Sequence, residues 1–577
     1  MKIFENKPIK YTCMTVMSLL TTIALATVSR YSITGIDILI PCVFALCMVV
    51  YSAATKHYNK ADLKFILPLS LIAAIAADLG GLMNMEERTF AACGITDVIC
   101  IILLLPFFAA TLQLLFFSSD VCRIKSEAGV FSFKSLMTKM AVMLICWLPY
   151  YLTYYPGGVG NDVFEELNMC LGNIPWTNHH PVAYTALMDA FVHIFGGGEQ
   201  AGLTRALGAM AFCQMLLLAL TLSLLVQWLV HKGMTRVSSA VVTLAFALHP
   251  IVAMYSIYLT KDVIFACIIV LLVLYLYDFM GLEKPKTWHY AILTVLSLLT
   301  VALRNNGLMV VLLTFIALFI IRRKQFAYLY LSLLLILGMN ALYKGPVFKA
   351  LGIEKQSFVE SASIPLSQVA YTIYTDGVID EEDSVYLESI MPFDKVKEEF
   401  EPGYTDSYKF SESFDADIID SDTGKFIKTW WHMLPDNFGR YVEAYLMQTS
   451  GYWCYGITNT VATEGVVDNE LGVAGCDFLF RAWGVSLKPL LAELVLIARK
   501  LPILCFFSQM GIQILCVILL AIQYIRKNHA ERLLILVPLF ALWLSVMIAT
   551  PAFCLFRYMC PVFFLWPLLI YEWLGTA

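Results

Sequence analysis

Long apolar runs constrain this chain more than any other feature of its sequence. About fourteen follow one another, and roughly 20 apolar residues are what a helix needs to cross the ~30 Å hydrocarbon core of a bilayer. Of all residues, 59% are hydrophobic and only 14% are charged, and the mean hydropathy is +0.74. The sequence therefore predicts an all-α polytopic membrane protein embedded in a lipid bilayer. The expected spans are 11–29, 36–53, 64–82, 95–117, 137–155, 202–230, 238–259, 263–280, 288–303, 307–321, 326–342, 501–525, 532–550 and 558–575.

Lysine and arginine residues are distributed unevenly over the short loops between these runs. If the N-terminus is cytoplasmic, the inner loops hold about twenty of them and the outer loops about five. Because positive residues concentrate in cytoplasmic loops, this count favours an even number of spans. We expect a bacterial cell-membrane protein with both termini in the cytoplasm and its large polar segments outside.

Two polar segments, 155–201 and about 343–500, interrupt the apolar pattern and divide the chain. Two shorter apolar segments, 181–195 and 483–498, are expected to be helices that lie along the membrane surface. The acidic stretch 398–422 is expected to be a solvated face. The predicted parts are an N-terminal four-helix extension (1–120), a membrane core (135–342) with an outer loop (155–201), an extracytoplasmic loop or domain of mixed structure (343–500) and a C-terminal three-helix segment (501–577).

Charged and polar residues gather at the helix ends that are predicted to face outward. Cations are disfavoured there, so a shared purpose is needed to explain them, and holding a phosphate group is one such purpose. The net charge of -5 and the lack of a concentrated basic surface exclude nucleic acid as the partner. The candidate site residues are Asp162, Glu165, Glu166, His179, His180, Arg205, Lys261, Asp262, Arg304, Asn305, Arg557 and Tyr558.

Each candidate also has a simpler interpretation. Asp162 could be the N-cap of a helix, with Glu165 and Glu166 as favourable acidic groups in its first turn. His179 and His180 could be metal or substrate ligands, or ordinary polar surface. Lys261 and Asp262 could form a salt bridge with each other, and Arg304 and Arg557 could extend independently to the membrane surface. Independent extension gives no reason for the cations to gather on one side.

These motifs resemble, in order and spacing, the GT-C superfamily of integral-membrane glycosyltransferases, which use polyprenyl-phosphate sugars on the outer face of the membrane. The set is also similar to an uncharacterised bacterial multi-pass family with Tyr-Pro-Gly, His-Pro, Lys-Asp and Arg-Asn-x-Gly signatures. A Gly-Gly-Val-Gly-Asn run before the early Asp departs from the superfamily pattern. The resemblance covers roughly 135–575 and is carried by Tyr155-Pro156 through Asp162, His180-Pro181, Arg205, Lys261-Asp262, Arg304-Asn305-Asn306-Gly307 and Arg557-Tyr558-Met559-Cys560-Pro561.

The resemblance implies that a sugar passes from a polyprenyl-phosphate donor to a glycan, lipid or protein acceptor. Asp162 would be the general base on the acceptor hydroxyl, the cations would stabilise the leaving phosphate, and a single displacement would invert the anomeric centre. Asp262, together with Asp162 or a histidine, could also bind Mg²⁺ or Mn²⁺. The alternatives are a transporter or flippase for a lipid-linked saccharide, or a polysaccharide polymerase or ligase. A transporter would place its ionisable groups near the middle of the bilayer.

Overall fold

The computed structural model describes residues 7–29, 39–84, 89–90, 92–121, 129–457, 459–501, 504–505 and 508–575. Within these ranges the secondary structure is helical, and only isolated β-bridges accompany the helices. The prediction of an all-α chain is confirmed. The expectation of mixed structure in 343–500 is wrong for the described residues, because helices account for the regular secondary structure there.

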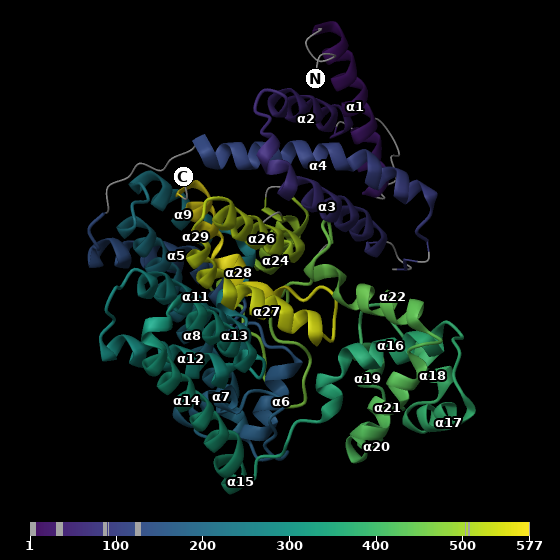
Figure 1. The fold of residues 1–577 in the computed structure, drawn as a ribbon. Coiled ribbons are helices and arrows are strands. Elements are labelled where there is room, and N and C mark those ends of the chain that lie inside the picture. Colours follow the sequence, from purple (N-terminus) through teal and green to yellow (C-terminus); the bar gives the residue numbers. More distant parts are fainter. Residues whose placement is uncertain are drawn as a thin grey trace.

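The N-terminal helices pack on one another and form their own layer, at the top of Figure 1. Helices α3 and α4 form the most extensive of these contacts, and α1 and α2 pack beside α4. The four helices are α1 (Lys7–Val28), α2 (Leu39–Ala54), α3 (Leu63–Met83) and α4 (Ile95–Val121).

A larger bundle forms the core, in which α5 packs on α8, α11 on α8 and α12, and α13 on α27. Its first part comprises α5 (Phe133–Thr153), α6 (Asn161–Cys170), α7 (Val182–Gly196), α8 (Leu203–His231), α9 (Arg236–Leu248), α10 (Pro250–Ile257), α11 (Lys261–Met280), α12 (Thr287–Leu303), α13 (Gly307–Ile321), α14 (Phe326–Leu342) and α15 (Phe348–Ala350). The C-terminal part adds α23 (Phe478–Trp483), α24 (Lys488–Lys500), α26 (Met510–Arg526), α27 (Val537–Ile548), α28 (Cys560–Phe564) and α29 (Trp566–Gly575).

A compact set of short helices stands beside the bundle, at the lower right of Figure 1. We call residues 358–449 the helical domain; its centre is the packing of α16 on α22. It begins with the 3₁₀ turn η6 (Phe358–Ser361) and contains α16 (Ser363–Tyr374), α17 (Glu381–Ile390), α18 (Phe393–Glu399), α19 (Asp406–Lys409), α20 (Ala416–Ser421), α21 (Thr423–Met433) and α22 (Phe438–Thr449).

The helical domain is tied to the loop that follows α27. Thr405 N donates to Pro551 O at 2.8 Å, and Phe553 N donates to Gly403 O at 3.0 Å. The buried side chain of Gln448 also donates to Thr550 O at 2.8 Å. These bonds fix the loop immediately before the 3₁₀ turn η9 (Phe556–Met559), which carries Arg557.

Eight helices in the described part are long and apolar enough to cross a membrane, and up to ten when each of two bent helix pairs counts as one span. One pair is α9 and α10, which bend by 61° at His249-Pro250, where a residue before proline is biased toward an extended conformation. Each of the fourteen predicted ranges contains a helix, but α2, α12, α13 and α26 have only 15 to 17 residues. In the predicted span 501–525, residues 502–503 and 506–507 lie outside the described residues.

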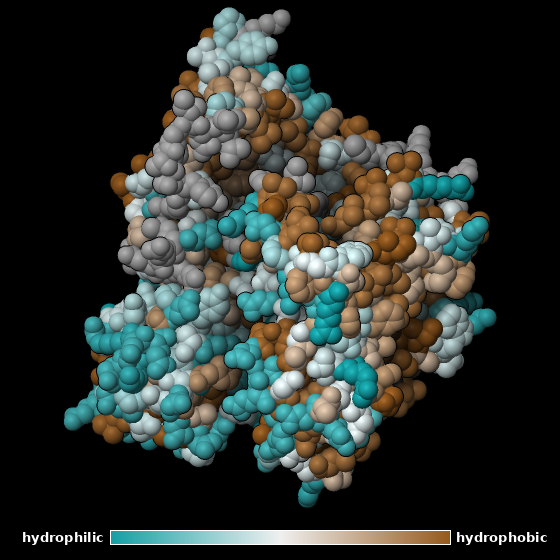
Figure 2. Space-filling view, turned by 180° about the vertical axis from the view of Figure 1, so that it is seen from behind, coloured by the Kyte–Doolittle hydropathy of each residue, from teal (hydrophilic) through white to brown (hydrophobic). Residues whose placement is uncertain are grey.

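The surface agrees with a membrane location for the bundle. Figure 2 shows hydrophobic side chains over the flank of the bundle and mainly hydrophilic ones over the helical domain. On α14, for example, Leu331, Leu334 and Leu335 are about half exposed. Leucine side chains on an unpaired helix face are stable in lipid, so the chain is a membrane protein with many helices in the bilayer.

Candidate functional site

The glycine-rich stretch before Asp162 runs between two other segments of the chain. Gly158 N donates to Ile257 O at 3.1 Å, Leu259 N donates to Gly158 O at 2.9 Å, and on the other side Val159 N donates to Gly465 O at 3.0 Å. A Cβ at Gly158 would lie 2.3 Å from a ring carbon of Tyr258, and one at Gly160 would lie 2.7 Å from the Tyr258 hydroxyl. The glycines are therefore required by this close packing, which the sequence showed only as a departure from a known pattern.

Asp162 lies in the first turn of α6, where it meets two cations from distant parts of the chain. Its Oδ2 accepts from Lys261 Nζ at 3.2 Å and from Arg557 Nη1 at 3.0 Å. The N-cap of α6 is Gly160, so the alternative of Asp162 as the N-cap is wrong. Burial alone would raise the pKa of Asp162, but the charges of Arg557 and Lys261 outweigh burial and hold the pKa well below its ordinary value.

Asp262 forms a second, deeper anionic centre. Its side chain is fully buried, with Arg304 Nη1 at 3.0 Å from Oδ1 and Arg557 Nε at 3.7 Å from Oδ2. Thr260 caps α11, and its hydroxyl accepts from the Asp262 N–H at 3.3 Å, which places Lys261 and Asp262 in the first helical turn. Since Lys261 pairs with Asp162 and Asp262 with the arginines, the interpretation of a Lys261–Asp262 salt bridge is wrong.

Tyr558 and Asn305 complete the cationic side of the site. The Arg304 guanidinium lies 4.7 Å from the centre of the Tyr558 ring, a cation–π distance. Asn305 donates to Asn178 O at 3.1 Å and to Gln356 Oε1 at 3.2 Å, so it joins the loop of the histidine pair to the entrance of the helical domain. Asn305 is therefore at the edge of the site.

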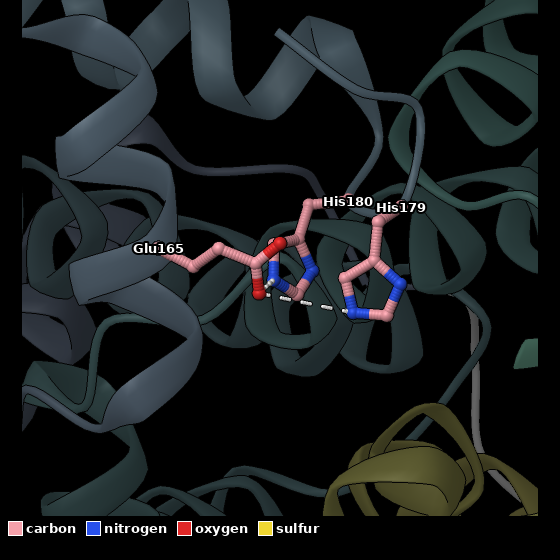
Figure 3. A group of neighbouring side chains, drawn as sticks. All are labelled: Glu165, His179 and His180. Carbon is pink, nitrogen blue, oxygen red and sulfur yellow. Dashed lines mark ion pairs between the residues drawn. The ribbon is translucent and has the colours of Figure 1, made fainter. Parts of the chain in front are cut away.

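Glu165, His179 and His180 form a group of their own beside Asp162 (Figure 3). Glu165 Oε2 lies 3.3 Å from His180 Nε2 and 3.9 Å from His179 Nε2. His180 is almost completely buried, and its Nδ1 is 2.7 Å from Lys261 Nζ. Burial would raise the pKa of Glu165, but hydrogen bonding to His180 and the histidine charges lower it overall. Burial and the neighbouring His180 lower the pKa of His179.

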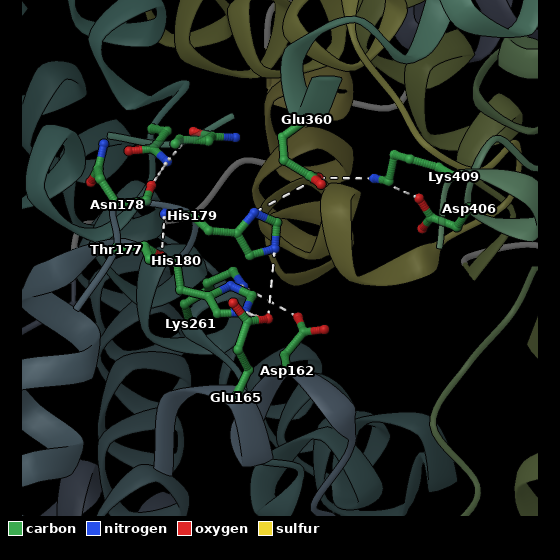
Figure 4. A network of polar contacts seen from close by, with 12 residues as sticks. Asp162, Glu165, Thr177, Asn178, His179, His180, Lys261, Glu360, Asp406 and Lys409 are labelled. Carbon is green, nitrogen blue, oxygen red and sulfur yellow. Dashed lines mark hydrogen bonds and ion pairs between the residues drawn. The ribbon is translucent and has the colours of Figure 1, made fainter. Parts of the chain in front are cut away.

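The network continues into the helical domain (Figure 4). His179 Nδ1 is 3.7 Å from Glu360 Oε2, and the same oxygen accepts from Lys409 Nζ at 2.9 Å. Lys409, whose side chain is only 3% exposed, also pairs with Asp406 at 2.9 Å. Neither Glu360 nor Lys409 was predicted from the sequence. Lys409 lies in the stretch 398–422, whose charges resemble a solvated face.

Glu166 differs from its neighbour Glu165, although both lie on α6. The side chain is buried, and neither carboxylate oxygen has a hydrogen-bond partner among the described residues. Burial is the main cause that raises the pKa of Glu166 to about 8; Lys261 opposes this effect, and Asp162 adds to it. At pH 7 most of the Glu166 population is therefore the neutral acid.

Arg205 is exposed and donates to Phe195 O, in the last turn of α7, at 2.7 Å. In the described part of the chain it forms no ion pair with the other predicted residues. Asp162 and Asp262 both lie within 4 Å of Arg557, so a guanidinium lies between the two predicted metal ligands. A metal ion on that pair stays a prediction.

Residues 172–575 match the model of a family of unknown function, DUF6020, and the chain belongs to that family. The matched region includes both histidines, Lys261, Asp262, Arg304 and Arg557, and it begins after Asp162 and Glu165. No curated protein and no solved structure matches the chain.

Proposed function

We propose that this chain is a membrane glycosyltransferase that uses a polyprenyl-phosphate sugar. The acceptor hydroxyl oxygen would attack the anomeric carbon while the bond from that carbon to the phosphate oxygen breaks. The hydroxyl proton would pass to Asp162, and the negative charge of the leaving polyprenyl phosphate would be stabilised by Lys261, Arg304 and Arg557. One displacement of this kind inverts the anomeric centre.

The observation that carries the proposal is the double contact of Asp162 with Lys261 and Arg557. A carboxylate with a strongly lowered pKa is a weak base, so both cations have to be drawn away before Asp162 can accept a proton. A donor phosphate would compete for the same cations and weaken their hold on Asp162. Donor binding would in this way raise the basicity of Asp162 at the moment when it is needed.

The position of the charges favours transfer over transport. Lys261 and Asp262 are the first two residues of α11, Arg304 follows the last residue of α12, and Arg557 precedes α28. At the other end of α11, Asp278 pairs with Lys232 at 2.7 Å. A transporter or flippase would be expected to place its ionisable groups midway along the spans. We further propose that this end of α11 is the outer face of a bacterial cell membrane and that both termini are cytoplasmic.

The test uses the purified full chain in lipid vesicles with a panel of polyprenyl-phosphate sugars and simple glycoside acceptors. Asp162→Asn should reduce transfer at least about 100-fold, the usual contribution of a general base. Asp189→Asn is the matched control, because Asp189 on α7 pairs with the exposed His193 at 3.2 Å. Equal transfer by Asp162→Asn would remove Asp162 as the base, and no transfer from any donor would refute the glycosyltransferase.

A further inference from the structure

Three side chains beside Asp162 present ligand atoms to one point. The carboxylate of Glu165 and one ring nitrogen each of His179 and His180 all lie within 4.8 Å of one another (Figure 3). Two imidazoles and one carboxylate are a ligand set that zinc enzymes use while a further position stays open. The three residues come from α6 and from the turn before α7, which pack on each other.

The spacing of the ligand atoms suits a small divalent cation. Bonds of about 2.1 Å at tetrahedral angles place neighbouring ligand atoms roughly 3.4 Å apart. Glu165 Oε2 is 3.3 Å from His180 Nε2 and 3.9 Å from His179 Nε2. The two histidine nitrogens lie within 4.8 Å of each other, so rotation of the side chains could bring all three ligand atoms onto one ion.

His180 is buried and is held on both sides. Its side chain is only 5% exposed, its Nε2 atom lies 3.3 Å from Glu165 Oε2, and its Nδ1 atom lies 2.7 Å from Lys261 Nζ. The Nε2 atom points at Glu165, where the ion would lie.

The surroundings of His179 resemble the outer shell of a metal site. A metal-bound imidazole usually donates its second N–H to a carboxylate, which fixes the ring orientation. Glu360 Oε2 is 3.7 Å from His179 Nδ1, an ion-pair distance that is longer than a hydrogen bond, and is itself held by the buried Lys409 (Figure 4). The helical domain would thus orient one ligand of the site.

Lys261 opposes metal binding, because its contact with His180 has to break before an ion can bind at Nε2. An ammonium only donates, so its 2.7 Å contact requires the His180 Nδ1 lone pair and leaves the proton of a neutral ring on Nε2. Metal binding at Nε2 needs that proton to move to Nδ1, which breaks the contact with Lys261. Binding would therefore release Lys261 from His180.

We propose that Glu165, His179 and His180 bind one divalent transition-metal ion of the Zn²⁺ class. The open position of the ion would accept an anionic oxygen. That this oxygen belongs to the phosphate of a lipid-linked sugar rests on the proposed function; the metal site itself does not.

The experiment measures metal binding and needs no substrate. The purified full chain is stripped with a chelator, and Zn²⁺ affinity is measured by competition with a chromophoric chelator; Co²⁺ gives a visible spectrum that reports the ligand set. We expect one ion per chain. Affinity should fall at least about tenfold in Glu165→Gln and His179→Ala, and about tenfold in the outer-shell variant Glu360→Gln. It should rise in Lys261→Met.

The control is His432→Ala, because His432 is an exposed histidine that lies 2.7 Å from Asp383 in the helical domain. His179 and Glu165 are chosen over the buried His180 because they are 26% and 40% exposed, and their removal is less able to disturb folding. If Glu165→Gln and His179→Ala bind Zn²⁺ as tightly as the unaltered chain, the proposed site is wrong. It is also wrong if only Asp162→Asn loses binding, because the ion would then lie on the Asp162–Asp262 pair. Absence of sugar transfer would leave these measurements unaffected.

Discussion

Arg557 Nη1 donates to Asp162 Oδ2 at 3.0 Å, although the two residues are 395 positions apart. Arg557 Nε lies 3.7 Å from Asp262 as well, so one guanidinium serves both carboxylates. This geometry depends on the planar fork of arginine, which a lysine ammonium cannot reproduce.

We predict that Arg557→Lys lowers kcat/KM for the proposed sugar transfer about 100-fold, the size of effect seen when one stabilising donor is lost. The lysine keeps the positive charge but reaches only one carboxylate. Steady-state kinetics in vesicles measures this effect. Arg205→Lys is the control, because Arg205 is exposed and bonds to the backbone oxygen of Phe195. Equal losses in the two variants would contradict a special role for Arg557.

Replacing Glu166 with glutamine should stabilise the chain in a pH-dependent way. Its pKa of about 8 in the folded chain is above its ordinary value, so its contribution is fully present below about pH 4.5 and is lost as pH rises toward 8. Glu166→Gln cannot ionise. The variant should therefore be more stable than the unaltered chain at pH 7 by up to about 3 kcal/mol, and equally stable at pH 4.

The matched control for this prediction is the adjacent Glu165→Gln. The pKa of Glu165 is lowered, so its contribution is present above its ordinary pKa and is lost at acid pH. This variant should be less stable at pH 7 and equal to the unaltered chain at low pH. Melting temperatures in detergent with a chelator present measure both. A Glu166→Gln variant that is less stable at pH 7 would show that the carboxylate is paired when folded.

Most of the fold could be predicted from hydrophobicity, because apolar runs of helical length have few alternatives in a bilayer. The predicted ranges 288–303 and 307–321 match α12 and α13 to within one residue, but the bend at His249-Pro250 inside the predicted span 238–259 was not predicted. The length of an apolar run predicts that a helix can cross a bilayer, and it does not predict where that helix bends. The helical domain was predicted only as a polar region, because its charges conceal a core such as that between α16 and α22.

The site was predictable in its members but not in its pairings. Sequence placed Asp162, Lys261, Arg304 and Arg557 on one side of the membrane, and the structure brings their side chains together. Which carboxylate meets which cation depends on the packing of distant helices. Lys409 was missed because a buried lysine and a solvated one have the same sequence signal.

Lys409 should be important for stability because its buried ammonium pairs with Glu360 and Asp406. Lys409→Met leaves Glu360, which is only 18% exposed, without that cation, and loss of one partner from a buried pair costs about 3–5 kcal/mol. We expect a lower melting temperature and faster proteolysis of the helical domain.

The added change Glu360→Gln should recover part of this loss, since it removes the unpaired charge. Lys395→Met is the control, because its 2.7 Å pair with Glu398 is exposed and should contribute little to stability. Equal losses in Lys409→Met and Lys395→Met would show that the pairs of Lys409 contribute no more than an exposed pair.

The glycines before Asp162 can be tested with alanine variants and a second substitution at Tyr258 that should restore only one of them. In Gly160→Ala the new Cβ would lie 2.7 Å from the Tyr258 hydroxyl, whereas the ring carbon that bears this hydroxyl is 3.7 Å away. Such a clash costs about 1–3 kcal/mol and displaces α6, so both melting temperature and Asp162-dependent transfer should fall. Tyr258→Phe removes the clashing oxygen and should restore Gly160→Ala. It should not restore Gly158→Ala, whose Cβ meets a Tyr258 ring carbon at 2.3 Å and the Tyr258 Cα at 3.2 Å. Rescue of both alanine variants, or of neither, would contradict this packing as the cause of the glycine-rich stretch.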